Sequence, residues 1–206
     1  MPDDPYLDDD DMRSPIDLRD AATARTWLAD SEAKRPYRPS IRARIADEVR
    51  GARSILELGG GPGLLAEAIL ATVDAAYTLV DFSPPMLEMA RARVPTASCL
   101  LRDLRDPAWS DGLEPFDAAV TMQAVHELRH KRRAAALYDQ VHALLEPGGV
   151  FVVCDHEPAD ARPLFMTAAE QHETLATAGF GDISTVMTVG TLYVITARRS
   201  ARWPRR

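Results

Sequence analysis

The most constraining feature of the sequence is a glycine-rich turn that follows an apolar run and precedes a helical segment. Residues 54–58 have the pattern of a short buried strand, residues 59–63 are Gly-Gly-Gly-Pro-Gly, and a helix is expected over residues 64–72. Similar pairs of strand and helix follow along the chain. Strands that alternate with helices need right-handed crossovers, so they lie parallel in one sheet covered on both faces. The sequence therefore predicts a doubly wound α/β sandwich.

The remaining runs complete a Rossmann-like, seven-stranded and mostly parallel sheet. Residues 183–189 and 191–197 are separated only by Gly190, which predicts an antiparallel C-terminal hairpin at the sheet edge. The other expected strands are residues 77–81, 97–101, 116–121 and 150–154, and the other expected helices are residues 18–33, 40–49, 84–93, 131–145 and 167–178.

Length and charge predict one domain with a charged segment at each end. The chain has 206 residues and a formal net charge of −7, and this length is typical of a single domain. Residues 1–12 carry six aspartates and residues 198–206 carry five arginines. Such charge blocks are typical of solvated ends, and neither identifies a partner. The expected divisions are a disordered acidic tail (1–16), a single domain (17–197) made of an N-terminal helical lid (17–50) and a Rossmann-like core (51–197), and a basic tail (198–206).

Cysteine usage and the lack of long apolar segments predict a cytoplasmic protein. Cys99 and Cys154 lie in apolar strand-like runs and match no metal-binding or disulfide pattern, so we expect reduced, buried thiols. The acidic N-terminus has no apolar region of a signal peptide. No apolar stretch approaches the roughly 20 residues of a membrane span, so we expect no association with a membrane.

The glycine-rich turn differs from the fingerprint of a dinucleotide site. That fingerprint is G-x-G-x-x-G, whereas Leu64 stands here at the third glycine position. Pro62 also removes an N–H group that would hold a pyrophosphate. The observed spacing is G-x-G-x-G, and it follows a carboxylate, Glu57, in an otherwise apolar strand. A tight turn without a ligand is the alternative for such a loop taken alone.

Two further acids follow the next strands and favour a ligand site. Asp81, followed by Phe82, ends the second strand, where it can accept hydrogen bonds from ribose hydroxyls while the ring packs on a base. Asp103, followed by Leu104, ends the third strand and can accept from an exocyclic adenine amine, or it can belong to a turn. Three acids at successive strand ends predict a negative pocket that suits a cationic nucleoside better than a pyrophosphate.

In order and spacing, these motifs resemble those of the class I S-adenosylmethionine-dependent methyltransferases. The resemblance covers roughly residues 40–197. Five matching segments in the same order are more specific than any one of them. The segments are Glu57 to Gly63, Asp81 to Leu87, Asp103 with Leu104, Phe116 to Val120 with Gln123 to Leu128, and Leu145 to Val150.

The resemblance implies S-adenosylmethionine as cofactor, S-adenosylhomocysteine as product and a role for each matching residue. The turn that contains Gly59 and Gly61 would contact the methionyl part, which Glu57 would help to hold through the ammonium group or the loop amides. Asp81 would bind the ribose hydroxyls. Phe82 and Met86 would flank the adenine, Asp103 and Leu104 would meet its amine edge, and Gln123 would lie beside the methionine portion.

His126 is the candidate general base for the methyl acceptor. It follows the fourth strand, where an acceptor would enter, and an imidazole with a pKa near 6.5 can take a proton from a hydroxyl or an amine. The equally supported alternative is that His126 caps or packs the following helix. His156, after the fifth strand, is a second candidate. Neither histidine stands with acids at a standard ligand spacing, so we expect no metal.

The acceptor is expected to be a small molecule and not a nucleic acid. Residues 83–86 are Ser-Pro-Pro-Met, but they follow the cofactor-binding strand, and proline at a helix start explains them better. Residues 35–39 and Trp27 are the expected lid over the acceptor. Tyr37 and Arg42 are further candidates to face the cofactor, with packing or exposure as the alternative.

Taken together, these observations favour methyl transfer from S-adenosylmethionine to a small-molecule O- or N-nucleophile. An aminopropyltransferase is an alternative because Gly59-Gly60-Gly61 also resembles that family, although Pro62 stands where that family tends to carry an acid. A regulatory or scaffold protein that binds the nucleoside without turnover is the alternative from another class. The sequence predicts no oligomeric state.

Overall fold

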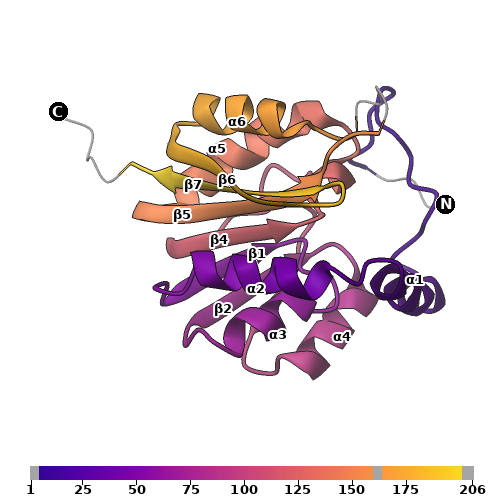
Figure 1. Ribbon diagram of the computed structural model, residues 1–206. Coiled ribbons are helices and arrows are strands. Elements are labelled where there is room, and N and C mark those ends of the chain that lie inside the picture. Colours follow the sequence, from indigo (N-terminus) through magenta and orange to yellow (C-terminus); the bar gives the residue numbers. More distant parts are fainter. Residues whose placement is uncertain (1–4, 160–163, 201–206) are drawn as a thin grey trace.

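The computed structural model describes residues 5–159 and 164–200, and its centre is one seven-stranded sheet (Figure 1). The strand order is β3-β2-β1-β4-β5-β7-β6. The first five strands in this order are parallel, and β7 lies antiparallel between β5 and β6. The predicted doubly wound fold with its antiparallel edge is confirmed. The strands are β1 (Ser54–Leu58), β2 (Ala76–Asp81), β3 (Ser98–Leu101), β4 (Phe116–Met122), β5 (Leu145–His156), β6 (Phe180–Val189) and β7 (Leu192–Arg199).

Helices cover both faces of the sheet and bury two apolar clusters against it (Figure 1). Side chains alternate along each strand, so Ile55 of β1 belongs to the cluster with α2 and α3, whereas Leu56 and Leu58 belong to the cluster with α5. Full burial of such a side chain contributes about 1.5–3 kcal/mol. The helices are α1 (Ala21–Ala33), α2 (Arg38–Glu48), α3 (Leu64–Leu70), α4 (Pro84–Arg93), α5 (Ala134–Leu144) and α6 (Ala168–Thr177), with short 3₁₀ turns η1 (Val125–Leu128) and η2 (Lys131–Arg133).

Local sequence signals determine where the helices beside the sheet begin. Ser83 caps α4 by accepting from the backbone N–H of Met86, and prolines occupy the first helical positions, as expected for Pro84-Pro85. Thr167 and Glu170 form a capping box at the start of α6. These caps place the first turn of α4 at the end of β2 and fix its direction across the sheet.

The strand order reverses between β1 and β4, and this reversal positions the candidate site. In a doubly wound sheet a crevice opens at the carboxyl ends of the strands on either side of such a reversal. Glu57 lies next to the last residue of β1, Asp81 ends β2, and Asp155 lies next to the last residue of β5. The fold therefore brings acids that are far apart in the sequence to one edge of the sheet.

Several predicted boundaries differ from the structure, among them the start of α1, which is Ala21 and not residue 18. β5 begins at Leu145 and not at residue 150, because the Pro-Gly-Gly segment continues in the strand direction. The helix expected from residue 131 is a 3₁₀ turn followed by α5 from Ala134. β6 begins at Phe180, three residues before the expected start, and its register shifts at Gly181/Ser184. Bulges interrupt the alternation of apolar and polar residues, which hides the start of such a strand in the sequence.

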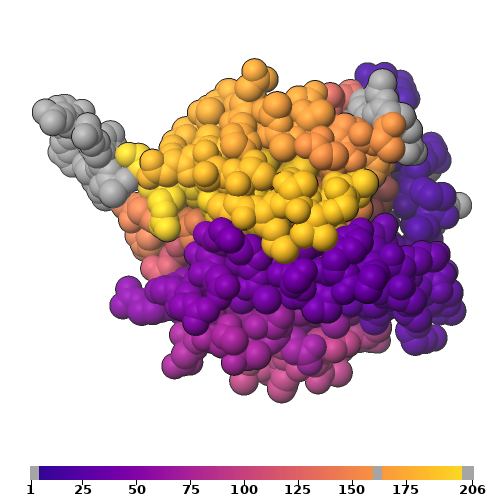
Figure 2. All heavy atoms as spheres, in the orientation of Figure 1, coloured from indigo at the N-terminus to yellow at the C-terminus, as the bar shows by residue number. Residues whose placement is uncertain are grey.

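The acidic N-terminal segment packs against the protein, which corrects the expected disordered tail for its described residues. We call residues 5–18 the N-terminal strap; it lies at the right-hand end of the molecule in Figure 2. The Asp11 side chain is fully buried and forms ion pairs with Arg132 and Arg133, at 3.2 and 2.6 Å. Arg133 also donates to the carbonyl of Tyr6 (2.9 Å). The aspartates are therefore paired with the arginines before α5. Residues 1–4 lie outside the described part.

The other expected divisions of the chain also differ in detail. Arg198 and Arg199, expected in the basic tail, belong to β7, whereas residues 201–206 lie outside the described part. Of the two helices in the expected lid, α2 contributes buried residues such as Ile41 and Ile45 to the central core. Trp27 and Leu28 of α1 line the candidate site. On this side the cavity is therefore bordered by α1, the loop after it, and Arg38 and Arg42 of α2.

The two thiols are free and neither is placed for chemistry. Cys154 is fully buried and Cys99 is half-buried, at the two sides of the sheet centre. Burial raises the pKa of both thiols, which keeps them protonated and unreactive. No helix in residues 5–159 or 164–200 combines the length and the apolar character needed to cross a membrane.

Candidate active site

The turn after β1 uses backbone conformations that glycine adopts most easily. Gly59, Gly61 and Gly63 have φ angles of 64°, 52° and 79°, in the left-handed region. A Cβ added to Gly59 would lie 2.3 Å from Cβ of Ala124, so this turn also packs tightly on the segment after β4. A Cβ added to Gly61 would meet nothing within 4 Å, and Gly61 lines the cavity described below. The turn therefore presents bare backbone to open space.

Asp81 at the end of β2 holds the turn in place. Its carboxylate accepts from the backbone N–H of Gly61 (2.8 Å) and of Ser83 (2.9 Å). Burial raises the pKa of Asp81 to about 6, although the two amide donors oppose the shift. Asp81 therefore joins the glycine turn to the start of α4. Its carboxylate also lines the cavity, where its oxygens can accept further hydrogen bonds.

Glu57 is a carboxyl group buried next to Asp81. Its side chain accepts from the Tyr77 hydroxyl of β2 (2.9 Å), and Glu57 is 2% exposed. Burial raises the pKa of Glu57 to about 8; the Tyr77 hydrogen bond opposes this shift and the charge of Asp81 adds to it. Such a group is costly to ionise in the absence of a nearby cation. Tyr77 was not among the predicted site residues.

The side chains expected around an adenine line one end of the same cavity. Met86 is buried at the start of α4, and the guanidinium of Arg19 lies 4.9 Å from the ring centroid of Phe82. Leu104 lines the cavity beside Asp103. The backbone N–H of Asp106 donates to the Asp103 carbonyl (2.9 Å). The turn expected as an alternative is therefore present, and Asp103 lines the cavity as well.

The cavity is not negative as a whole, which corrects the expectation from three acids at the strand ends. Asp103 forms ion pairs with Arg105 (2.7 Å) and Arg19 (3.6 Å). The lining residues include eight arginines and six acids. Glu57 and Asp81 form a local acidic pair, and burial raises the pKa of each. The arginines escaped the prediction because they come from the strap, from α2 and from loops distant in sequence.

His126 and Asp155 form a hydrogen-bonded pair across β4 and β5. The Nδ1 atom of His126 lies 2.7 Å from Oδ1 of Asp155, and the backbone N–H of His126 donates to Oδ2 (3.1 Å). Burial lowers the pKa of His126, but the charge and hydrogen bond of Asp155 outweigh burial and raise it above its ordinary value. His126 lies in the 3₁₀ turn η1 and also lines the cavity. Its position is therefore compatible with packing in this turn and with a role as a base.

His156 faces the same cavity with the opposite pKa shift. Its pKa is lowered to about 4, chiefly by burial and also by the nearby cations of His126, Arg35 and Arg38, against the opposing charge of Asp155. Its Nε2 atom contacts the Gln123 side chain. Phe165 completes a group of three rings, with its centroid 4.9 Å from that of His126 and 5.8 Å from that of His156. Two imidazoles whose pKa values are separated in one cavity are typical of acid–base sites.

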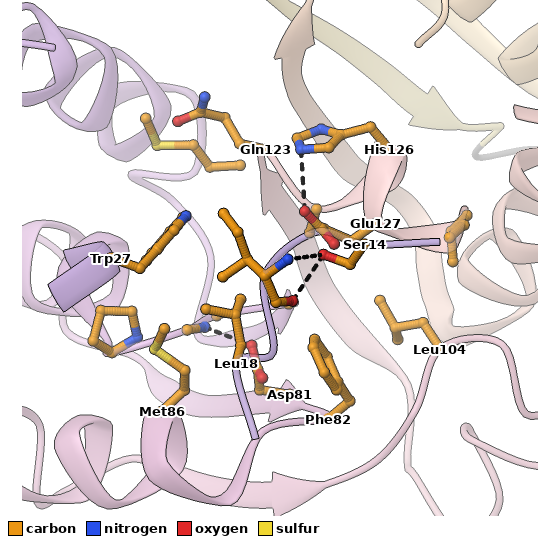
Figure 3. A pocket seen from close by; sticks show the side chains of 18 of the residues that line it. Ser14, Leu18, Trp27, Asp81, Phe82, Met86, Leu104, Gln123, His126 and Glu127 are labelled. Carbon is orange, nitrogen blue, oxygen red and sulfur yellow. Dashed lines mark hydrogen bonds and ion pairs between the residues drawn. The ribbon is translucent and has the colours of Figure 1, made fainter. Parts of the chain in front are cut away.

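The cavity at the strand ends has a volume of about 850 Å³ and is lined by most of these side chains, although Tyr77 and Asp155 are not among its lining residues. The strap crosses it: Ser14 and Leu18 lie among the side chains from the strand ends in Figure 3. The Leu18 carbonyl accepts from the Ser83 hydroxyl, and the backbone N–H of Met12 donates to the Arg129 carbonyl (3.0 Å). The strap is therefore a wall of the cavity.

The structure brings every predicted site residue to this one cavity. Among the further candidates, His156, Trp27 and Arg42 also line it, whereas Tyr37 contacts Gly190 of the β6–β7 hairpin. Asp155 was not assigned a site role, although it ends a strand as Glu57 and Asp81 do. The predicted residues that line the cavity are Glu57, Gly59, Gly61, Asp81, Phe82, Met86, Asp103, Leu104, Gln123 and His126.

Metal-binding side chains do not cluster in the described part of the chain. No group of three or more histidine, cysteine, aspartate or glutamate side chains in residues 5–159 and 164–200 has the arrangement of a metal site. His126, His156 and Asp155 come closest to one. Their nearest atoms form hydrogen bonds with each other and with Gln123, which orients the imidazoles toward proton transfer.

Comparison of the sequence with known proteins identifies a methyltransferase domain. The family model described as a methyltransferase domain matches residues 55–149. An uncharacterized methyltransferase-like protein of Schizosaccharomyces pombe is 30% identical over 141 residues, 67% of this chain and 52% of that protein. A trans-aconitate 2-methyltransferase of Methylobacterium radiotolerans is 33% identical over 117 residues, 56% of this chain and 43% of that protein. The chain spans about half the length of these relatives.

Solved structures of methyltransferases share the fold. Human N-acetylserotonin methyltransferase in complex with SAM superposes with a TM-score of 0.71 at 18% identity, over 89% of this chain and 57% of that one. The DhpI–SAH complex superposes with a TM-score of 0.69 at 21% identity, over 89% of this chain and 97% of that one. At these identities the likeness concerns the fold.

The strand order and the glycine turn define a doubly wound α/β protein with a nucleoside-type crevice. Residues 55–149 match the methyltransferase-domain family, and the fold is the one found in methyltransferases that bind SAM or SAH. The resemblance found in the sequence motifs is thereby confirmed.

Proposed function

We propose that this protein binds S-adenosylmethionine and transfers a methyl group to an oxygen or nitrogen nucleophile of a small molecule, with S-adenosylhomocysteine as the product. One observation carries the proposal: the glycine turn, the acids Glu57 and Asp81, and His126, which is paired with Asp155, line a single cavity. One end of this cavity suits a nucleoside with a cationic side chain, and the other suits a proton acceptor.

The residues present fit this cofactor. The bare backbone at Gly61 leaves room that a Cβ would fill, and Asp81 can accept from ribose hydroxyls while it holds the turn. Glu57 has one hydrogen-bond donor, Tyr77, so an ammonium group beside it would stabilise its ionised form. When bound, the cofactor supplies an electrophilic methyl group on its sulfonium, and the thioether that is left after transfer is uncharged.

The acceptor end of the cavity is suited to removing a proton. Asp155 fixes His126 with Nδ1 toward the carboxylate, which leaves Nε2, 3.5 Å from Oε1 of Glu127, as the atom that would take a proton from a hydroxyl or an amine. The strap and α1 enclose the acceptor, which excludes water and orients the nucleophile. An enclosed cavity of about 850 Å³ favours a small molecule over a polymer.

Calorimetric titration with S-adenosylhomocysteine tests cofactor binding, and a screen with labelled S-adenosylmethionine tests transfer. Trans-aconitate belongs in the screen because a relative is named for it. We expect binding, and transfer of label to at least one small hydroxy, carboxy or amino compound. Failure of the wild-type protein to bind the nucleoside would refute the proposal. If the protein binds the nucleoside but transfers no label to any compound in a cell extract, the regulatory or scaffold alternative would be favoured instead.

A further inference from the structure

Three arginines from the junction of α1 and α2 line the acceptor side of the cavity. Arg35 lies in the loop after α1, and Arg38 and Arg42 lie one turn apart on α2. The backbone N–H of Arg38 donates to the Arg35 carbonyl (3.1 Å), so this tight turn directs neighbouring side chains to the same cavity. Three guanidinium groups on so short a segment repel one another unless anions lie between them.

One carboxylate within this group balances only part of its charge. Glu32 of α1 lies 2.8 Å from Arg38 and 2.9 Å from Arg42. The Arg35 side chain forms no hydrogen bond or ion pair with any residue of the described chain. Within residues 5–159 and 164–200, two of the three positive charges in the group are therefore left without an anion.

Arg38 also carries an unused donor in a buried position. Its side chain is 7% exposed, and its Nη1 atom donates to Glu32 and to the Ser31 hydroxyl. Its Nε atom is buried and reaches no acceptor in the described residues. A buried donor without an acceptor is costly. Contact between α1 and α2 explains the Glu32 ion pairs, but it explains neither this Nε atom nor Arg35.

The described surroundings of the arginines add no carboxylate that pairs with Arg35. Arg35 and Arg38 are close enough to His156 to lower its pKa, and His156 is uncharged at neutral pH. Asp155 is engaged with His126. His156 and Phe165 supply flat apolar surface beside these arginines in the same cavity. An anion would be attracted there and would lie next to the candidate base.

From this arrangement we propose that the methyl acceptor carries a carboxylate, or an anion of similar size, which Arg35 and Arg38 bind. A guanidinium pair matches the two oxygens of a carboxylate, and Nε of Arg38 gains an acceptor. The anion fixes the molecule at one end, and its hydroxyl or amine then lies toward His126. This assignment of substrate class rests on the proposed methyltransferase function.

Matched acids and amides test the proposal. The probes are salicylate and 4-aminobenzoate, each paired with its carboxamide, which are titrated into the protein saturated with S-adenosylhomocysteine. We expect each acid to bind at least ten times more tightly than its amide. Arg35→Gln should remove most of this preference and leave the affinity for S-adenosylhomocysteine within twofold. Arg38→Lys keeps the charge but loses the Nε donor, and it should weaken the acids to a smaller extent.

Arg44→Gln is the matched control. Arg44 lies on α2, pairs with Glu48 (2.6 Å) and does not line the cavity, so the acid preference should persist in this variant. The proposal is overturned if neither acid binds, if acids and amides bind equally, or if the preference survives Arg35→Gln. Failure of the wild-type protein to bind S-adenosylhomocysteine would instead refute the proposed function, and titration of the acids into the free protein would still report on the arginines.

Discussion

Among the carboxyl groups of the described residues, Glu57 is the one whose ionisation is most strongly opposed by its surroundings. Burial raises its pKa to about 8 from an ordinary value of 4.5, so the folded protein holds a proton that the unfolded chain releases. The stability that this proton confers is complete below pH 4.5 and is lost as the pH rises through about 8. Asp81, with its pKa raised to about 6, acts in the same direction.

Glu57→Gln should therefore change how stability depends on pH. The amide can still accept the Tyr77 hydrogen bond, and it cannot ionise. The free energy of unfolding of the variant, measured relative to wild type, should therefore be about 1–3 kcal/mol higher at pH 8.5 than at pH 5.5. Urea unfolding at the two pH values measures this difference. Glu114→Gln, at an exposed site, is the control. An equal difference for both variants would contradict the buried ionisation.

His126 determines a second pH dependence, of the reaction. If the neutral imidazole takes the proton, activity falls as the pH drops through the pKa of His126, which lies above 6.5 because of Asp155. We expect a profile of kcat/KM with one ascending limb centred above pH 6.5. His126→Ala should lower kcat by roughly 10²–10⁴-fold and leave S-adenosylhomocysteine binding intact. Unchanged turnover in this variant would remove His126 from the mechanism.

Asp155 is a positioning residue for His126, and its substitution gives a different signature. Asp155→Asn removes the negative charge that raises the pKa of His126 but keeps the shape of the side chain. The ascending limb should then move to lower pH, by about one unit. A purely structural role would lower activity at every pH without moving the limb, and a profile measured from pH 5 to pH 9 separates the two.

Gly59 shows how the turn depends on packing as well as on backbone angle. Gly59→Ala combines a left-handed φ with a Cβ 2.3 Å from Ala124, so it should destabilise the protein by about 2–4 kcal/mol. Gly112 has a φ of 76° and open space around an added Cβ. Gly112→Ala should therefore cost only about 1 kcal/mol. Denaturant unfolding of both variants measures the difference, and equal losses would show that crowding contributes nothing.

At the scale of elements, the N-terminal strap carries several aspartates and also forms one wall of the cavity. The aspartates of the strap are held by arginines that precede α5. Because a segment held mainly by ion pairs separates from the body more readily than a packed helix, we expect a ligand to enter by displacing the strap. The remainder of the wall belongs to strands and helices of the core.

Loosening the strap should accelerate ligand exchange. Arg133 contacts the strap at Asp8 and Asp11 and at the Tyr6 carbonyl, so Arg133→Gln should raise the dissociation rate of S-adenosylhomocysteine roughly tenfold, as expected for a loss near 1.4 kcal/mol. Stopped-flow displacement measures this rate. Arg50→Gln, an exposed arginine paired with Asp47 on α2, should leave it unchanged. Equal rates in wild type and Arg133→Gln would show that the strap does not control exchange.

For the whole molecule, ligand binding should stabilise both layers, because the cavity is lined by residues from each side of the sheet. At a concentration 100 times its dissociation constant, S-adenosylhomocysteine should add about 2.7 kcal/mol of stability. This corresponds to a rise in Tm of roughly 5–10 °C for a chain of this size. Thermal unfolding with and without the nucleoside measures it. Adenosine alone, which lacks the group that Glu57 would hold, should give a smaller rise.

Much of the fold was predictable because local patterns and the fold agree. The strand of residues 54–58, the proline start of α4 and the hairpin at Gly190 each have a signal within a few residues. The start of β6 was not predictable, because its bulges interrupt the alternation. The strap was not predictable either. Six aspartates within the first twelve residues resemble a solvated tail until the arginines that pair with some of them are placed in space.

The sequence by itself determined the strands, the glycine turn and the acids at the strand ends, because these depend on periodicity and on the backbone freedom of neighbouring residues. Only the tertiary structure decided what those acids face. Asp103 is paired with arginines, Glu57 is held protonated by burial, and Asp155 turns His126 toward the cavity. Charges and hydrogen bonds act through space over a few ångströms. The partners that set them lie on other strands and loops, beyond the reach of any local pattern.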